Sequence, residues 1–167
     1  MLALKPEAFS LRWYDDMIYG TKNPWGLAFR NSLLIGFFST IGATALGTLA
    51  ALGLSSRFMP YKALIMSVLI SPMIVPLIIT AAGMFFFFAK LNLVSTLPGL
   101  IIAHTILGIP FVVITVTASL AGFDNNLLRA GATLGGSPLR NFFKIQAPLI
   151  APGVISGALF AFITSFD

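Results

Sequence analysis

The stretch GATLGGSPLRNFFKIQAP, residues 131–148, is a polar interruption in a chain that is otherwise strongly apolar. On insertion scales, each Arg or Lys costs roughly 2.5 to 3.5 kcal/mol at the centre of a bilayer. Arg140 and Lys144, together with Arg129 just before the stretch, would therefore oppose burial in lipid by roughly 10 kcal/mol. The stretch is expected to lie in water, at the membrane interface or against another protein, and to separate two apolar parts of the chain.

The sequence around this stretch has the composition of a membrane protein. Of the 167 residues, 57% are hydrophobic and only 9% are charged, whereas soluble domains carry about 25% charged residues. The runs without Asp, Glu, Lys or Arg are residues 31–56, 63–89, 91–123 and 145–166. Each run exceeds the roughly 20 residues that a helix needs to cross a bilayer. Their length, and the lack of strict period-two alternation, favour helices over a transmembrane barrel.

We therefore predict an all-α fold, a polytopic membrane helical bundle of about four transmembrane helices with a helical elbow outside the membrane. The helices are expected near residues 31–54, 63–88, 99–122 and from 149 onward. Small residues allow helices to approach closely in lipid, and they form a stripe in the first and last of these helices. The stripes are Gly36, Thr40, Ala43, Gly47, Ala51 and Ser55, and Gly153, Gly157, Ala161 and Ser165. Both faces are expected to pack against protein rather than lipid.

The motif content argues against an enzyme. The sequence has no G-x-x-x-x-G-K-[ST] phosphate loop, no G-x-S-x-G elbow and no H-E-x-x-H, and it holds one His, no Cys and five acidic residues. We predict no catalytic residue, no metal site and no cofactor bound by this chain. Basic runs interleaved with aromatic residues are lacking too, so nucleic acid is not an expected partner.

The polar interruption carries two sets of helix-boundary signals. Asp124 or Asn125 can cap a first short helix, and the pair Gly135–Gly136 suits the positive φ of a helix stop. Ser137 can cap a second helix with Pro138 in its first turn, and Pro148 is expected to end that element. The product is an elbow of two short helices with an apolar face edged by cations. Two interpretations stay open: an elbow resting on lipid headgroups, or one docked in a partner's groove.

This stretch resembles the cytoplasmic EAA loop of ABC importer permeases. The pattern of that loop is Glu-Ala-Ala, three residues, Gly, nine residues, then Ile-x-Leu-Pro. The corresponding positions here are Arg129, Ala130, Gly131, Gly135, Ile145, Ala147 and Pro148. All three gap lengths match. The departures are Arg129 for the motif's Glu, which reverses the charge, Gly131 for its second Ala, and Ala147 for its Leu.

The resemblance runs across nearly the whole chain. The segments AHTILGIPFVVITVTASLAGFD, residues 103–124, and APLIAPGVISGALFAFITSFD, residues 147–167, also look like polyamine and putrescine permeases. The resemblance implies a type I ABC importer permease-like subunit, multi-pass in the bacterial inner (plasma) membrane, for a small cationic solute such as a polyamine. It also implies three partners: a cytoplasmic ATP-binding subunit that holds the ATP, a second permease subunit and a periplasmic solute-binding protein. Family permeases carry further spans, so the chain is expected to be truncated at both ends.

Charge alone leaves the orientation undecided, because five cations fall on each predicted side. Those in the short loops near span ends, where the positive-inside rule has most force, are Arg57, Lys62, Arg129, Arg140 and Lys144. The resemblance places these loops in the cytoplasm, with residues 124–147 as the coupling loop of a transmembrane permease domain, 31–167. Residues 1–30 hold Trp13, Tyr14, Tyr19 and Trp25 and are expected to form an extracytoplasmic or interfacial segment.

Five residues are candidates for the translocation pathway. Pro72 and Pro76 would kink their helix, which then either lines the pathway or simply packs as a kinked helix. His104 is either a buried hydrogen-bonding group or a proton relay. Ser165 and Asp167 belong to an SFD stretch that lies near the route in related permeases. A carboxylate at Asp167 would suit a cationic substrate, or it could mark the helix end.

Two other functions remain open on the sequence. One is a non-transporting membrane anchor or assembly subunit whose elbow rests on lipid. The other is an inactive permease fragment.

Overall fold

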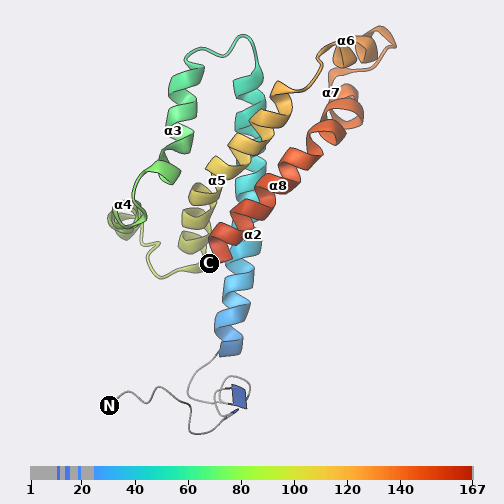
Figure 1. The fold of residues 1–167 in the computed structure, drawn as a ribbon. Coiled ribbons are helices and arrows are strands. Elements are labelled where there is room, and N and C mark those ends of the chain that lie inside the picture. The colour runs from blue at the N-terminus through green and yellow to red at the C-terminus, as the bar shows by residue number, and fades with distance from the viewer. Residues whose placement is uncertain (1–10, 12–13, 16–18, 20–24, 167) are drawn as a thin grey trace, which may run out of the picture. The chain divides into compact units, whose positions relative to one another are not determined.

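The computed structural model describes residues 11, 14–15, 19 and 25–166, and the ordered elements in this part of the chain are all helical. They are α2 (Trp25–Ser55), α3 (Lys62–Ile74), α4 (Leu77–Lys90), α5 (Leu97–Ala121), α6 (Asn126–Thr133), α7 (Pro138–Asn141), the π-helical turn η1 (Phe142–Gln146) and α8 (Ala147–Phe166) (Figure 1). The chain divides into two compact units, residues 1–34 and 35–167, and the elements after α2 all lie in the second. The predicted all-α fold is confirmed.

Three helices are long and apolar enough to cross a membrane as continuous spans. They are α2, α5 and the run Pro138–Phe166, which joins α7, η1 and α8. The first begins at Trp25 rather than near residue 31, so the last residues of the expected interfacial segment are helical. Within that segment Tyr14 and Tyr19 are exposed, and Trp13 lies outside the described residues.

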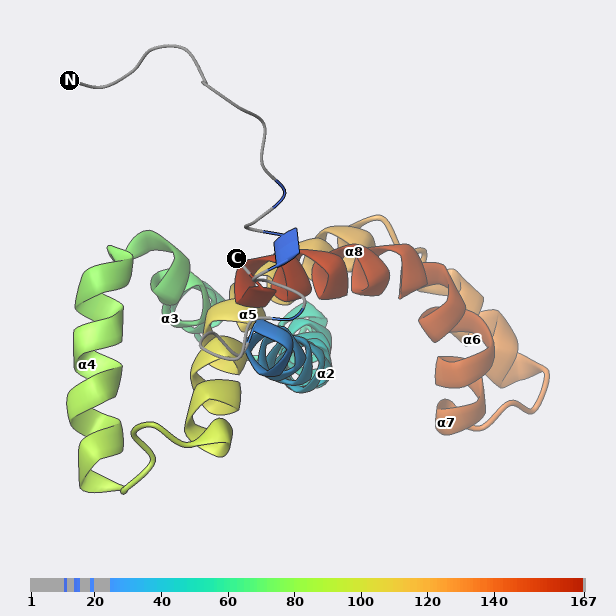
Figure 2. The same cartoon turned by 90° about the horizontal axis from the view of Figure 1, so that it is seen from below.

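The run expected as one helix over residues 63–88 is broken. It forms α3 and α4, whose axes are bent by 103° at the break. Pro76 has no amide hydrogen to continue the helix and disfavours helical backbone at the preceding residue. Val75 accordingly adopts φ −71° and ψ 135°. Figure 2 shows α4 along its length where Figure 1 shows it nearly end-on. The predicted total of about four spans thus corresponds to three continuous helices and one bent pair.

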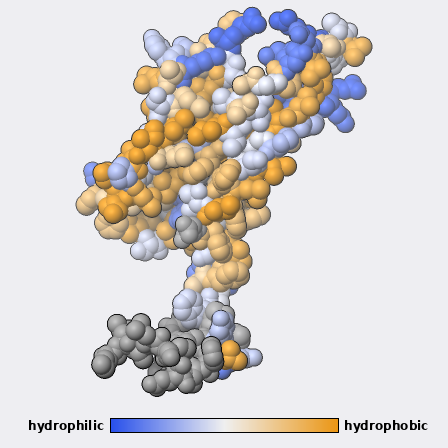
Figure 3. All heavy atoms as spheres, in the orientation of Figure 1, coloured by the Kyte–Doolittle hydropathy of each residue, from blue (hydrophilic) through white to orange (hydrophobic). Residues whose placement is uncertain are grey.

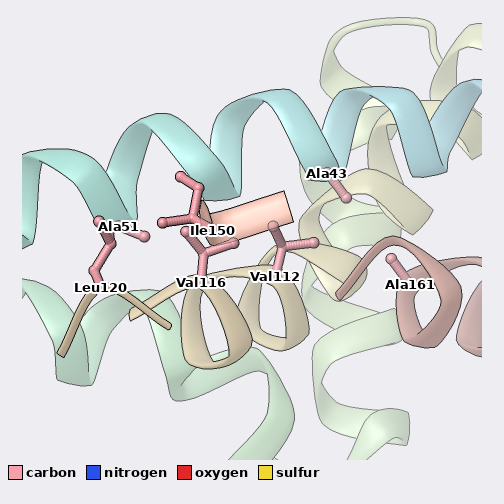
Figure 4. Close-up of a cluster of buried hydrophobic side chains, with 7 residues drawn as sticks. All are labelled: Ala43, Ala51, Val112, Val116, Leu120, Ile150 and Ala161. Atoms are coloured by element: carbon pink, nitrogen blue, oxygen red, sulfur yellow. The ribbon is translucent and has the colours of Figure 1, made fainter. Parts of the chain in front are cut away.

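The core of the second unit lies between α2, α5 and α8. Figure 4 shows its side chains: Ala43 and Ala51 from α2, Val112, Val116 and Leu120 from α5, and Ile150 and Ala161 from α8. Both predicted small-residue stripes contribute, since Gly36, Ala43, Gly47, Ala51, Gly153, Gly157 and Ala161 are all buried. Ser55 is exposed, which ends the first stripe one turn early.

Glycines set the separation of these helices. A Cβ added at Gly108 of α5 would lie 3.0 Å from the Cβ atoms of both Ala43 and Ala161. A Cβ at Gly47 would lie 2.7 Å from Val112 Cβ. Any larger side chain at these points would push the helices apart. Lipid supplies no hydrophobic drive for helix association, so this close backbone approach provides much of the packing energy.

The polar loops gather at one end of the second unit. The α2–α3 connection and the elbow formed by α6 and α7 lie at the same end, and the α4–α5 connection lies at the other (Figure 1). Figure 3 shows hydrophilic residues concentrated at the elbow end and apolar residues along the helices. The structure therefore places at one end the segments that hold Arg57, Lys62, Arg129, Arg140 and Lys144, as the order of the predicted spans requires (Figure 1).

Candidate functional site

The elbow spans residues 124–147, and its first arm is α6. The sequence left two candidates for its cap, and the structure selects one of them. The Asp124 Oδ1 atom accepts a hydrogen bond of 2.9 Å from the Asn126 amide, whereas the Asn125 side chain makes no capping bond. The carboxylate also lies at the positive end of the helix dipole, where a negative charge is favourable.

The end of α6 is a Schellman motif centred on Gly135. The Gly136 amide donates to the Gly131 carbonyl over 2.9 Å, and the Gly135 amide donates to the Ala132 carbonyl over 3.0 Å. This pair of bonds requires a left-handed residue, and Gly135 has φ +81°. The prediction of positive φ is confirmed for Gly135 and wrong for Gly136, because the motif needs only one such residue.

The second arm begins as predicted and continues further than predicted. The Ser137 Oγ atom accepts a hydrogen bond of 3.3 Å from the Arg140 amide, with Pro138 as the first helical residue. Pro148, however, does not end this element, since the helix runs on to Phe166. The turn before it is π-helical, with the Ala147 amide donating to the Phe142 carbonyl five residues back. We attribute the tolerance of Pro148 to this change of hydrogen-bond register.

Asn141 is the residue of the elbow that sequence reasoning missed. Its side chain is 8% exposed. Its Nδ2 donates to the Leu128 carbonyl over 3.5 Å and to the Gly136 carbonyl over 3.3 Å. These bonds connect the second arm with α6 and with the turn that follows it. No periodicity in the sequence marks the position, because a polar residue on a short helix is usually solvated.

The outer face of the elbow carries large apolar side chains. Leu134 is 89% exposed, Leu139 69% and Phe143 61%. The cations Arg129, Arg140 and Lys144 are also exposed, as are Ala130, Ser137, Pro138 and Pro148 of the predicted docking residues. By contrast, Gly131 and Ile145 are half-buried and face each other across the elbow. An apolar patch among cations, at the polar end of the bundle, is typical of a contact surface for a partner.

The pathway candidates are not brought together in one place. Pro72 lies within α3 and Pro76 at the bend before α4. His104 lines a cavity of about 250 Å³ between α4 and α5, together with Thr80, Ser95 and apolar residues. Within the described part of the chain, its Nδ1 atom has no hydrogen-bond partner.

The two C-terminal candidates have different outcomes. The Ser165 hydroxyl contacts Ser39 of α2 instead of the His104 cavity. Asp167 lies outside the described residues.

These observations define a multi-pass helical membrane protein with a structured elbow at its polar end. Residues 43–167 match the family described as the inner membrane component of binding-protein-dependent transport systems, and the chain belongs to this family. By that description, the members of the family are inner membrane components of transport systems. The resemblance to ABC importer permeases is confirmed.

Several curated permeases are similar to this chain over most of its length. It is 30% identical over 161 residues to the spermidine/putrescine transport system permease protein PotC of Haemophilus influenzae, an alignment covering 96% of this chain and 62% of that protein. It is 28% identical over 144 residues to the sulfoquinovosyl glycerol transport system permease protein SmoH of Agrobacterium fabrum, covering 86% and 50%. It is 30% identical over 155 residues to the osmoprotective compounds uptake permease protein GgtD of a Synechocystis strain, covering 93% and 51%. The chain thus spans between half and two thirds of the length of these relatives.

Proposed function

We propose that the chain is the permease subunit of an ATP-driven importer, with residues 124–147 docked on a separate cytoplasmic ATPase that holds the ATP. A second permease subunit and a periplasmic solute-binding protein would complete the assembly. The observation that carries this proposal is the elbow, whose apolar side chains are exposed at the end of the molecule where hydrophilic residues gather (Figure 3).

The elbow is suited to passing movement into the membrane. Its second arm belongs to the same uninterrupted helix as the membrane-crossing residues, Pro138–Phe166. A displacement of the elbow by a partner would therefore shift α8 as a unit. Since α8 packs closely on α5, that shift would reach the core of the bundle.

For the substrate we propose a small cationic solute of the polyamine class. The support is the 30% identity to a spermidine/putrescine permease over 96% of the chain. The relatives named for sulfoquinovosyl glycerol and osmoprotective compounds make an uncharged or anionic solute the competing possibility.

Transport is tested by reconstituting the full chain in vesicles with the proposed ATPase, second permease and solute-binding protein. We expect ATP-dependent uptake of labelled putrescine or spermidine. Uptake of an uncharged glycoside instead would reject the polyamine assignment and leave the importer assignment intact. No ATP-dependent uptake of any of these solutes would contradict the proposed function.

Docking is tested with a single thiol. The chain has no cysteine, so Leu134→Cys introduces one reactive group at an 89% exposed position. We expect a membrane-impermeant maleimide to label it from the cytoplasmic side, and bound ATPase to slow the labelling. A matched thiol at the exposed Phe58 in the α2–α3 connection reports general access at the same end. Labelling of Leu134→Cys that is slow in lipid without ATPase would favour the headgroup-bound anchor.

A further inference from the structure

We infer that Asn141 is a positioning residue that holds α6 against the second arm of the elbow. We also infer that the glycine at position 131 leaves the space that the Asn141 side chain occupies. The inference rests on the proposed docking function of the elbow. It concerns how the docking surface is held in shape, and it can fail or succeed separately from docking.

The Asn141 amide joins two backbone segments of the elbow. Its Nδ2 donates to Leu128 in α6 and to Gly136 in the turn. Both bonds are partly shielded from solvent, and leaving such a carbonyl unsatisfied costs more than the bond itself contributes. The amide therefore selects one orientation of α6 relative to the start of the long helix.

Two glycines make room for this side chain. A Cβ at Gly131 would lie 2.8 Å from Asn141 Oδ1 and 2.7 Å from Ile145 Cδ1. A Cβ at Gly136 would also collide with Asn141 Oδ1, and it would lie 2.7 Å from the Gly131 carbonyl oxygen. The two positions differ in kind, because Gly131 faces only side-chain atoms and Gly136 faces backbone as well.

This geometry accounts for one departure from the loop pattern. The pattern has alanine where this chain has Gly131, and an alanine there requires Asn141 Oδ1 and Ile145 Cδ1 to move from their observed positions. Residues 131 and 141 thus form a matched pair. Glycine at position 131 goes with asparagine at position 141, and alanine at position 131 would go with a smaller side chain at position 141. The contact lies where force applied to α6 would pass into α8.

The test is a double-mutant cycle on the purified full chain in detergent, read by the rate of tryptic cleavage within the elbow. Arg129, Arg140 and Lys144 supply the cleavage sites. When opening is fast, cleavage follows the population of the opened elbow. We expect Gly131→Ala to accelerate cleavage by about fivefold or more, as overpacking does. In an Asn141→Ala background, the same Gly131→Ala change should have a clearly smaller effect, and the remainder reflects Ile145 Cδ1, which the added Cβ would still meet at 2.7 Å.

Two controls make the result specific. Gly136→Ala should stay disruptive in the Asn141→Ala background, since its clash with a backbone oxygen remains. Gly122→Ala should leave cleavage unchanged, because its added Cβ would lie 3.9 Å from the Ser119 carbonyl oxygen, an ordinary van der Waals contact. An equal effect of Gly131→Ala in both backgrounds would overturn the inference. Because this readout contains no ATPase, loss of the proposed docking function would not alter the cycle.

Discussion

The hydroxyl oxygens of Ser39 and Ser165 lie 2.9 Å apart although the residues are separated by 126 positions in the chain. Ser39 is 1% exposed, and its hydroxyl also lies 3.2 Å from the Gly36 carbonyl. The pair connects the last turn of α8 to α2 within the second unit. Ser165 thus makes a packing contact between two helices, and its place in the translocation pathway stays a prediction.

Ser165→Ala should have a small effect on transport and a small effect on stability. Interhelical hydrogen bonds in membranes contribute about 0.6 kcal/mol on average. We expect a coupling of that size between Ser39→Ala and Ser165→Ala in a double-mutant cycle of unfolding, and uptake within about twofold of the wild type. A fall in uptake of more than tenfold for Ser165→Ala, with unchanged stability, would place Ser165 in the pathway instead.

Gly108→Leu should separate the three helices of the core. The added side chain would meet Ala43 and Ala161, whose Cβ atoms lie 3.0 Å from the position of a Cβ on residue 108. Overpacking of this kind costs about 1 to 3 kcal/mol or more. We expect a lower thermal unfolding temperature of the purified chain. Gly83→Leu is the matched control, because a Cβ there would meet nothing within 4 Å; equal destabilisation by both changes would argue against the core described above.

Gly135 should tolerate asparagine better than valine. The left-handed backbone at φ +81° costs glycine nothing and asparagine a modest amount, whereas a β-branched residue is a genuine outlier there. We expect Gly135→Val to weaken ATPase co-purification strongly and Gly135→Asn to retain most of it. Membrane insertion, measured in the same preparations, should be normal for both. Equal retention for both variants would mean that the turn is not required for docking.

The apolar and charged parts of the elbow should contribute differently to ATPase binding. Leu139→Ala and Phe143→Ala remove exposed apolar side chains, and such side chains dominate interface energies when they are buried by a partner. Substituting glutamine for Arg129, Arg140 and Lys144 should mainly slow association and reduce its salt dependence. Binding kinetics of the chain in nanodiscs at two salt concentrations separate the two effects. Leu49→Ala, at an exposed apolar position on α2, is the control and should leave binding unchanged.

Those parts of the molecule that depend on interactions within a few residues could be predicted before the structure was known. Hydropathy fixed the number and approximate length of the apolar runs, because the cost of placing charge in lipid does not depend on neighbouring helices. The capping signals at Ser137 and the left-handed Gly135 were likewise predictable, since a helix end is satisfied by residues within one turn. The family followed from the spacing of the loop motif.

Tertiary structure decided what depends on contacts between distant residues. Sequence periodicity marked the small-residue stripes. It could not show that Gly108 packs against both Ala43 and Ala161, because that contact depends on how three helices are arranged around one another. The prediction that Pro148 ends its helix was wrong. Whether a proline ends a helix or is accommodated depends on the hydrogen-bond register of the turn before it, which the sequence does not show. Asn141 is the clearest case: its burial exists only once α6 folds back onto the long helix, and nothing within one turn of the residue records that contact.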